Sequence, residues 1–394
     1  MRVALIVRGG VEEASEERNN APIFVHLIRR LAASADVRVV SLHGENRVTL
    51  ASLYRSDASV HRFAGAEVVQ LGTARMLALR VPTDLVRVAA ALHATGRRSG
   101  RPEVIHGIGL SPGLTATFAG RLLGIPSVVS LIGGELTSLP EIDYGDLRTA
   151  KGRVIVKTLL RTAGTITVAS RFMQERVERH GARARLMPFG IDAGRFAGPV
   201  DRTDGPPFRL LHVGTLCPLK DQLTLVESLR RLVERGLDFT LDVVGWDDWQ
   251  GRVQLEAARL GVGQRIRFHG WMGQDGVVAL CRSAHGFVMT SRDDVAPAAV
   301  LEAAAAGLPI VGTRVGFIAD WAPDRAIATP IRDPGALADA LQRVLTRRDE
   351  RVRLGSQAQA WVFRHASLEA NDAYLRLYAE LAARGRAAAK SAPL

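Results

Sequence analysis

Two carboxylates on one short stretch are the strongest sign of chemistry in the sequence. Asp294 and Glu302 lie in TSRDDVAPAAVLEAAAAGLPIVG (residues 290–312), with seven residues between them. A buried strand predicted at 286–289 leads into the polar loop that holds Asp294, and a helix predicted at 298–306 holds Glu302. Backbone N–H groups at the start of such a helix bind anions. The stretch is therefore expected to bind an anionic ligand, although its spacing fits an ordinary alanine-rich helix with a solvated Glu302 equally well.

The residues between the two acids suit the start of a helix. Val295, Ala296 and Ala298 each offer a backbone N–H to an anion, whereas Pro297 has none and fits the first helical turn. The small side chains at 303–306 let a ligand or a neighbouring strand approach closely.

Short apolar, β-branched runs alternate along the whole chain with longer amphipathic segments. Strands are predicted at 3–7, 37–42, 104–106, 127–132 and 165–168, and in the second half at 209–213, 240–244, 266–269, 286–289, 309–312 and 326–328. Strands that are apolar on both faces and separated by helices are typical of parallel βαβ units. The sequence thus predicts an α/β protein with two doubly wound, Rossmann-like domains facing across a cleft, where ligands bind outside the carboxyl ends of the strands.

One segment interrupts this alternation. Residues 197–207, AGPVDRTDGPP, are rich in Pro, Gly and Asp and poor in apolar residues, which is typical of a linker. We therefore predict a first domain at 1–198 and a second at 199–365. Residues 366–394 are expected to form a helix that crosses back to the first domain, followed by a disordered tail.

Charge is distributed unevenly between the two halves of the 394 residues. Residues 1–200 hold 27 Lys and Arg against 17 Asp and Glu, and residues 201–394 hold 25 against 23, so most of the net charge of +12 lies in the first half. This asymmetry indicates an anionic partner for the first half, and no nucleic acid is expected. The two cysteines have no metal-ligand spacing, and no G-x-G-x-x-G motif follows the first strand of either half, which argues against a dehydrogenase.

A basic stripe marks the helix predicted within 147–163. Arg153, Lys157 and Arg161 recur every four residues and share one helix face. The apolar residues Val154, Ile155, Leu159 and Leu160 lie to other sides and could pack on the domain. No stretch reaches the ~20 apolar residues of a membrane span, so a cytoplasmic protein is expected. Peripheral contact with the anionic inner face of a membrane is a further expectation. The alternative is a solvated, arginine-rich face that reflects genome composition.

Further motifs surround the acidic pair in a fixed order. They are Val213-Gly214-Thr215-Leu216 with Lys220, Val243-Val244-Gly245, Phe268-His269-Gly270, Gly307-Leu308-Pro309 and, in the first half, Leu123-Gly124-Ile125-Pro126 and Pro188-Phe189-Gly190-Ile191-Asp192. With these motifs the sequence resembles the family 4 glycosyltransferases, which are retaining, nucleotide-sugar-dependent enzymes of the GT-B fold. The resemblance extends over nearly the whole chain and is strongest at 209–345.

The resemblance implies that the second domain holds a nucleotide-sugar donor. Glu302 would accept hydrogen bonds from the ribose hydroxyls and Asp294 from the transferred sugar, because a carboxylate offers two acceptor oxygens. Lys220 would stabilise the leaving diphosphate in place of a metal, so that Lys220 and Asp294 are the expected catalytic residues. The expected donor-binding residues are Gly214, Thr215, Lys220, Gly245, His269, Asp294, Val295, Ala296, Pro297, Ala298 and Glu302. The nucleotide sugar is a substrate, and no cofactor or metal is expected.

The resemblance also implies an acceptor side in the first domain. Its expected residues are Gly9, Gly10, Gly133, Gly134 and Glu135. The acceptor would be a glycan, a lipid-linked molecule or a small molecule.

Three departures from the family pattern leave alternatives open. Thr215 stands where the family often has arginine, Asp294 where glutamate is common, and Ile132 where histidine is frequent. One alternative is a non-catalytic sugar-nucleotide-binding or scaffold protein. Another is a nucleotide-sugar epimerase on the same fold, which would want a histidine at the cleft, and Ile132 counts against it.

Overall fold

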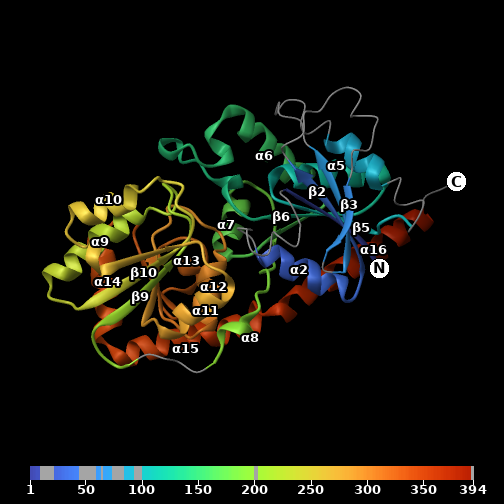
Figure 1. Cartoon of the computed structure of the whole chain (residues 1–394). Helices are drawn as coiled ribbons and strands as arrows, with labels where there is room; N and C mark the ends of the chain where they lie inside the picture. Colours follow the sequence, from blue (N-terminus) through green and yellow to red (C-terminus); the bar gives the residue numbers. More distant parts are fainter. Residues whose placement is uncertain are drawn as a thin grey trace.

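Two separate β-sheets, each flanked by helices, form the body of the protein (Figure 1). The computed structural model describes residues 1–8, 22–43, 59–63, 65–72, 84–92, 100–198 and 203–391. Nearly every strand pair is parallel, as expected when each strand is followed by a crossover helix. The predicted α/β class with two doubly wound domains is confirmed.

The first domain contains an eight-stranded sheet of order β3-β4-β2-β1-β5-β6-β7-β8. Its strands are β1 (Arg2–Arg8), β2 (Asp36–His43), β3 (Ser59–Phe63), β4 (Ala66–Gly72), β5 (Val104–Ile108), β6 (Ser127–Leu131), β7 (Thr165–Val168) and β8 (Arg185–Leu186). Among the described strands of this sheet, β3 alone runs antiparallel to its neighbour, β4. The helices are α2 (Pro22–Ala32), α5 (Leu110–Leu123), α6 (Ala150–Thr162) and α7 (Arg171–Arg179). β5 and β6 are buried along their whole length, which explains their continuous apolar runs.

The second domain contains a six-stranded parallel sheet of order β11-β10-β9-β12-β13-β14. Its strands are β9 (Phe208–Val213), β10 (Phe239–Val244), β11 (Ile266–Gly270), β12 (Gly286–Met289), β13 (Ile310–Thr313) and β14 (Ala326–Thr329). Its helices are α9 (Gln222–Glu234), α10 (Arg252–Arg259), α11 (Gln274–Ser283), α12 (Ala298–Ala305), α13 (Gly316–Trp321), α14 (Pro334–Thr346) and α15 (Arg348–His365). The strand order reverses between β9 and β12, and the loops that follow these two strands are therefore neighbours.

The chain crosses between the domains twice. The first crossing holds the short helix α8 (Ala193–Phe196), and the second leads from α15 into α16 (Asp372–Ser391). The two crossings touch, because the backbone N–H of Gly190 donates to Oδ1 of Asn371 at 2.9 Å. Helix α16 then lies against the first domain (Figure 1), where Asp372 pairs with Arg30 at 2.7 Å. The boundaries at 198 and 365 remain predictions.

A buried polar cluster fastens α16 to the first sheet. Nδ1 of His106 lies 2.6 Å from the hydroxyl of Tyr378, and its Nε2 lies 2.8 Å from Oγ of Ser130. All three residues are almost fully buried. His106 is thus a hydrogen-bonded core histidine, and burial lowers its pKa to about 3.

This lowered pKa predicts that the protein loses stability in mild acid. The unfolded chain binds a proton at His106 near pH 6.5, whereas the folded chain does not do so until about pH 3. The contribution of His106 is therefore complete above pH 6.5 and falls by up to ~1.4 kcal/mol per pH unit as the pH drops towards 3. The free energy of unfolding, measured with urea from pH 7 to pH 4, should decline less steeply in His106→Gln than in the wild type. Parallel declines in the two proteins would contradict this prediction.

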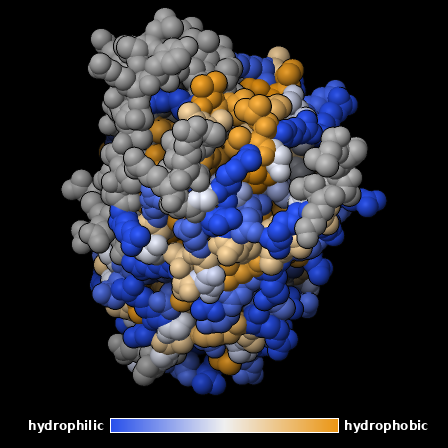
Figure 2. Space-filling view, turned by 90° about the vertical axis from the view of Figure 1, so that its right-hand side faces the viewer, coloured by the Kyte–Doolittle hydropathy of each residue, from blue (hydrophilic) through white to orange (hydrophobic). Residues whose placement is uncertain are grey.

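The outer end of the first domain carries a mixed surface. Figure 2 shows this face, with hydrophobic side chains gathered over one part of it among hydrophilic ones. Val86 and Leu122 are examples of exposed apolar side chains in this domain. Within the ranges given above, no helix is long and apolar enough to cross a membrane.

The helix predicted within 147–163 is α6, and its basic stripe faces solvent. Arg153, Lys157 and Arg161 are all exposed, while Val156 and Leu159 are buried on the opposite side. The expectation that Val154 packs on the domain is wrong, because this side chain is 65% exposed. Val154 adds an apolar group to the exposed face of α6.

Candidate active site

Lys220 and Asp294 meet because the strands before them are neighbours. Lys220 lies in the loop after β9 and Asp294 in the loop after β12. The two loops are hydrogen-bonded to each other, since Oγ1 of Thr290 donates to the carbonyl of Lys220 at 2.8 Å and the N–H of Arg292 donates to that of Leu219 at 2.8 Å. Parallel sheets leave a ligand-binding crevice where the strand order reverses, and both residues lie at that place.

The Lys220 ammonium forms an ion pair and a short hydrogen bond with Oδ2 of Asp294. Their side chains are only 23% and 16% exposed. Burial by itself would lower the pKa of Lys220, but the charge and the hydrogen bond of Asp294 outweigh burial and raise it. Lys220 is therefore charged at neutral pH. An ammonium has three donors, so Lys220 can bind a further anion without releasing Asp294.

Glycines bring the ends of three strands together beside this pair. Gly245 has a φ of 148°, and a Cβ at this residue would lie 2.2 Å from the carbonyl oxygen of Gly214. The N–H of Gly214 donates to Val244 and that of Gly245 to Gly270, both at 2.8 Å. Only glycine fits at 245, and the backbones at the carboxyl edge of the sheet remain close to any ligand bound there.

Two other predicted donor residues are tied to their surroundings. Nε2 of His269 lies 2.7 Å from Oδ1 of Asp242, a buried residue on β10. The carbonyl of Thr215 accepts from Nε2 of Gln222 at 2.9 Å. His269 and the backbone of Thr215 thus have fixed positions at the edge of the crevice.

Gly316 packs closely against the loop that leads into α12. Pro297 is the N-cap residue, with φ −63° and ψ 119°, so the regular helix begins at Ala298. A Cβ at Gly316 would lie 2.4 Å from the carbonyl oxygen of Asp294 and 2.8 Å from that of Val295. Val295 is buried, and Ala296 packs against the core of the second domain. The loop that carries Asp294 is therefore tightly packed.

Glu302 lies one turn into α12 and is half-buried. Burial raises the pKa of this carboxyl to about 7. Hydroxyl groups that donate to it would favour the ionised form.

On the first domain, Glu135 is folded into its own loop. Its carboxylate accepts from the N–H of Ile132 at 3.1 Å and of Gly133 at 2.7 Å, and the residue is only 4% exposed. Burial raises the pKa of Glu135. The side chain thus shapes the glycine loop rather than projecting from it. Gly9 and Gly10 lie outside the described residues.

Tyr144 packs against this loop, near the charges of the acidic loop of the second domain. A Cβ at Gly134 would lie 2.9 Å from Cζ of Tyr144, so the absence of a side chain there admits the ring. Burial raises the pKa of Tyr144, and the nearby charges of Asp293, Asp294 and Glu135 raise it further. Thr137, just after this loop, donates to Asp293 of the acidic loop, so the predicted acceptor loop and the acidic loop lie close together.

Asp293 joins the two domains directly, a contact that could not be predicted from the sequence. Its carboxylate accepts from Oγ1 of Thr137 at 2.5 Å and pairs with Arg176 of α7 at 2.8 Å. Arg176 also donates to Thr137 at 2.9 Å, and Asp293 is 1% exposed. A second bond between the domains lies nearby, where Asp320 accepts from the first N–H groups of α7. The adjacent acids at 293 and 294 were visible in the sequence, but the partners of Asp293 lie more than a hundred residues away.

Sequence models of two known families match the two domains. Residues 21–190 match the family described as "Glycosyl transferase 4-like domain", and residues 207–347 match "Glycosyl transferases group 1". The fold is of the GT-B type, with two Rossmann-like domains, and both family models describe glycosyltransferases. The chain belongs to the family 4 glycosyltransferases, as its motifs indicated.

Curated relatives carry glycosyltransferase names. The chain is 28% identical over 261 residues to the D-inositol 3-phosphate glycosyltransferase of Corynebacterium jeikeium, which covers 60% of this chain and 62% of the relative. It is 25% identical over 321 residues to the 2-deoxystreptamine glucosyltransferase of Streptomyces kanamyceticus, covering 76% and 78% of the two chains. The match to the corynebacterial enzyme therefore spans about three fifths of that relative's length.

Solved structures share the fold over almost the whole chain. Sucrose-phosphate synthase from Thermosynechococcus elongatus superposes with a TM-score of 0.75 at 19% identity, covering 97% of this chain and 99% of that chain. HepE of Anabaena in complex with UDP-glucose gives a TM-score of 0.70 at 16% identity, covering 96% and 98%. At these identities the likeness shows the fold alone.

Proposed function

We propose that this protein transfers a glycosyl group from a nucleoside-diphosphate sugar to an acceptor, with retention of anomeric configuration and without a metal. One observation carries the proposal. Lys220, a charged and largely buried lysine, is paired with Asp294 at the place where the strand order of the second sheet reverses. The domain that holds this sheet matches a glycosyltransferase family. The neighbour crystallised with UDP-glucose supports a UDP-sugar as a first donor to test.

The residues of this chain supply the steps of the reaction. Glu302 accepts from the ribose hydroxyls and Asp294 from the hydroxyls of the transferred sugar. As the bond between the sugar and the diphosphate breaks, negative charge grows on the diphosphate oxygens. The fixed Lys220 ammonium stabilises this charge most strongly at that moment, which is how it accelerates the step. The loop at Gly133 and Gly134, which lies close to the acidic loop, forms the acceptor side.

The stereochemistry and the metal requirement can be tested together once a donor and an acceptor are found. From an α-linked nucleotide sugar we expect an α-linked product, identified by the coupling constant of its anomeric proton. Because the positive charge of Lys220 does the work of a cation, EDTA should leave the rate unchanged. A β-linked product would contradict retention. Loss of activity in EDTA that magnesium restores would contradict the metal-free mechanism.

A lipid-linked acceptor would bring the protein to a membrane surface, and the exposed basic stripe of α6 suits such a surface. Each basic residue near an anionic leaflet contributes on the order of 1 kcal/mol, screened by salt. We expect binding to vesicles of anionic lipid at low salt that is lost when Arg153, Lys157 and Arg161 are replaced by Gln. Replacing the exposed Arg252, Arg259 and Arg364 of the second domain, as a matched control, should change little.

No binding of the wild type to anionic vesicles at low salt would contradict this membrane role. A soluble acceptor would then remain for the same active site.

A further inference from the structure

Two tryptophans are exposed and stacked on each other at the carboxyl edge of the second sheet. Trp246 lies just after β10 and is 46% exposed, and Trp271 lies just after β11 and is 36% exposed. Their ring centroids are 6.1 Å apart and their planes differ by 22°. The other three tryptophans of the chain pack against the cores of the second domain. Exposed aromatic surface of this kind is typical of places where a ligand or a partner binds.

The backbone of Trp246 is fixed against the loop that carries Lys220. Its carbonyl accepts from the N–H of Leu216 in that loop at 2.7 Å, and the N–H of Asp248 donates to the carbonyl of Leu216 at 3.1 Å. The carboxylate of Asp247 accepts from two backbone N–H groups just before α10, both at 2.9 Å. The turn that presents the Trp246 indole is therefore held beside the loop of Lys220.

The turn that carries Trp271 leaves room beside the indole. It is flanked by Gly270 and Gly273, and a Cβ at either residue would meet no atom within 4 Å. Gly270 has a φ of 66°, in the left-handed region that favours glycine. Met272 packs against the core of the second domain, so the turn is anchored while Trp271 remains exposed.

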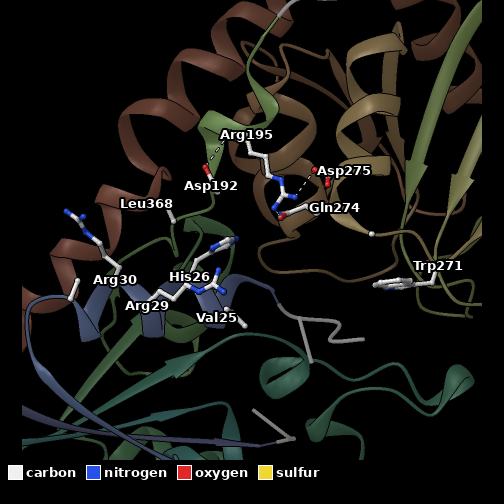
Figure 3. Close-up of a pocket in the computed structure, with 12 residues that line it drawn as sticks. Val25, His26, Arg29, Arg30, Asp192, Arg195, Trp271, Gln274, Asp275 and Leu368 are labelled. Carbon is white, nitrogen blue, oxygen red and sulfur yellow. Dashed lines mark hydrogen bonds and ion pairs between the residues drawn. The ribbon is translucent and has the colours of Figure 1, made fainter. Parts of the chain in front are cut away.

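A cavity of about 560 Å³ borders Trp271, and this volume lies in the range of small-molecule sites. Its other walls come from α2 of the first domain, from α8 and from the start of α11. Figure 3 shows the Trp271 indole extending toward the side on which Val25 of α2 lies. Arg195 of α8 donates to Gln274 at 2.6 Å and closes another side. The Trp271 ring therefore contacts Trp246 and also borders open space.

The position of the two tryptophans relative to Lys220 matches the shape of a nucleotide. Strands β11, β10 and β9 are consecutive neighbours in the sheet, and Lys220 follows β9. Neighbouring strands lie ~4.8 Å apart, so the ends of β11 and β9 are separated by about 10 Å. A nucleoside diphosphate extends over about that distance from its base to its terminal phosphate. The helix of Glu302, α12, packs in the same core as α11, which begins beside Trp271. A nucleotide with its diphosphate at Lys220 can therefore place its base at the tryptophans.

We propose that Trp246 and Trp271 form a stacking platform for the base of the nucleotide donor: the base lies against the Trp271 indole in the cavity, and Trp246 supports that indole. The proposal rests on the proposed function, in which the donor diphosphate lies at Lys220. Every base has an apolar face that stacks on an aromatic ring. The platform therefore contributes affinity for the nucleotide and does not select among bases.

The test is calorimetric titration of the full-length protein with UDP, GDP and ADP and with inorganic pyrophosphate, which carries the diphosphate charge but has no base. We expect Trp271→Ala to bind the nucleotides about tenfold more weakly than the wild type and to bind pyrophosphate equally well. Trp271→Phe keeps an aromatic ring and should lose much less affinity. Phe363→Ala is the matched control, because it removes another exposed aromatic ring, on α15, and should change neither affinity.

Tryptophan fluorescence gives a second measurement that does not depend on affinity. A base stacked on an indole quenches its emission, so the nucleotides should quench the wild type and pyrophosphate should not. The quench should be smaller in Trp271→Phe and unchanged in Trp249→Phe, because Trp249 packs against the core. Equal quenching in these two variants would contradict the place given to the base.

The outcomes separate this proposal from the proposed function. Equal nucleotide affinities of Trp271→Ala and wild type, or equal losses for nucleotides and pyrophosphate, would overturn the platform alone. Nucleotide binding that depends on Trp271, without transfer from any donor, would overturn the transferase and leave the platform standing. A wild type that binds none of the three nucleotides would overturn both.

Discussion

Lys220→Met should lower the rate of glycosyl transfer by about 100-fold or more while leaving the protein folded. The substitution keeps an unbranched side chain of similar length and removes the charge that stabilises the leaving diphosphate. A preorganised donor of this kind contributes about 3 kcal/mol in a water-poor site, which corresponds to that loss. The rate should be measured as release of nucleoside diphosphate at saturating donor, because an effect on the transition state lowers kcat and not only donor binding.

Lys220→Arg is the matched control for this prediction. It retains the positive charge, so we expect it to keep part of the activity that Lys220→Met loses, with its wider guanidinium fitting less well beside Asp294. A folded Lys220→Met protein with wild-type kcat would show that the lysine takes no part in the reaction.

Arg176→Met should also reduce transfer strongly, although Arg176 lies in the first domain. The substitution leaves the buried carboxylate of Asp293 without its cation, and an uncompensated buried charge costs about 3–5 kcal/mol. Because this pair connects the domains, the cost can be relieved when the domains separate and water reaches Asp293. We expect the rate of transfer to fall by at least ~10-fold, since the conformation in which the two domains are in contact at Asp293 becomes the less populated one.

Arg179→Met is the matched control on the same helix, since Arg179 is exposed and its side chain donates to the carbonyl of Glu175. It should have nearly wild-type activity. The double variant Arg176→Met, Asp293→Asn should recover part of the loss, because replacing both partners leaves no buried charge. Small-angle scattering would reveal the separation as a larger radius of gyration. Equal activities of Arg176→Met and Arg179→Met would contradict the role given to the contact between the domains.

The sequence predicted the parallel sheets well because their strands carry a local signal. Runs such as 104–106 and 127–132 are apolar on both faces, and this pattern can be recognised without knowing which strands lie next to them. The hairpin of β3 and β4 was missed, since its strands, SVHRF and AEVVQLG, mix polar and apolar residues without a long apolar run, and they pair antiparallel at the edge of the sheet. Local pattern thus identified the buried strands better than the edge ones.

The positions of the site residues could be predicted where a single motif contains the residue, but not where the two domains meet. Lys220 and Asp294 belong to loops after adjacent strands, so their contact follows from strand order. The buried hydrogen bonds of Glu135 and the bond between Arg195 and Gln274 depend on how distant segments pack. No spacing rule encodes such contacts. The roles assigned to the individual site residues remain predictions that the variants above address.

The central claim, that this fold transfers a sugar from a nucleotide donor, has one direct test. The wild type and Lys220→Met should be incubated with a panel of UDP-, GDP- and ADP-sugars, and free nucleoside diphosphate should be quantified with and without acceptors. The account predicts slow release from at least one donor without acceptor, faster release with the right acceptor, and neither in Lys220→Met. Tight nucleotide binding with no release from any donor would contradict the account and favour a sugar-nucleotide-binding protein without catalysis.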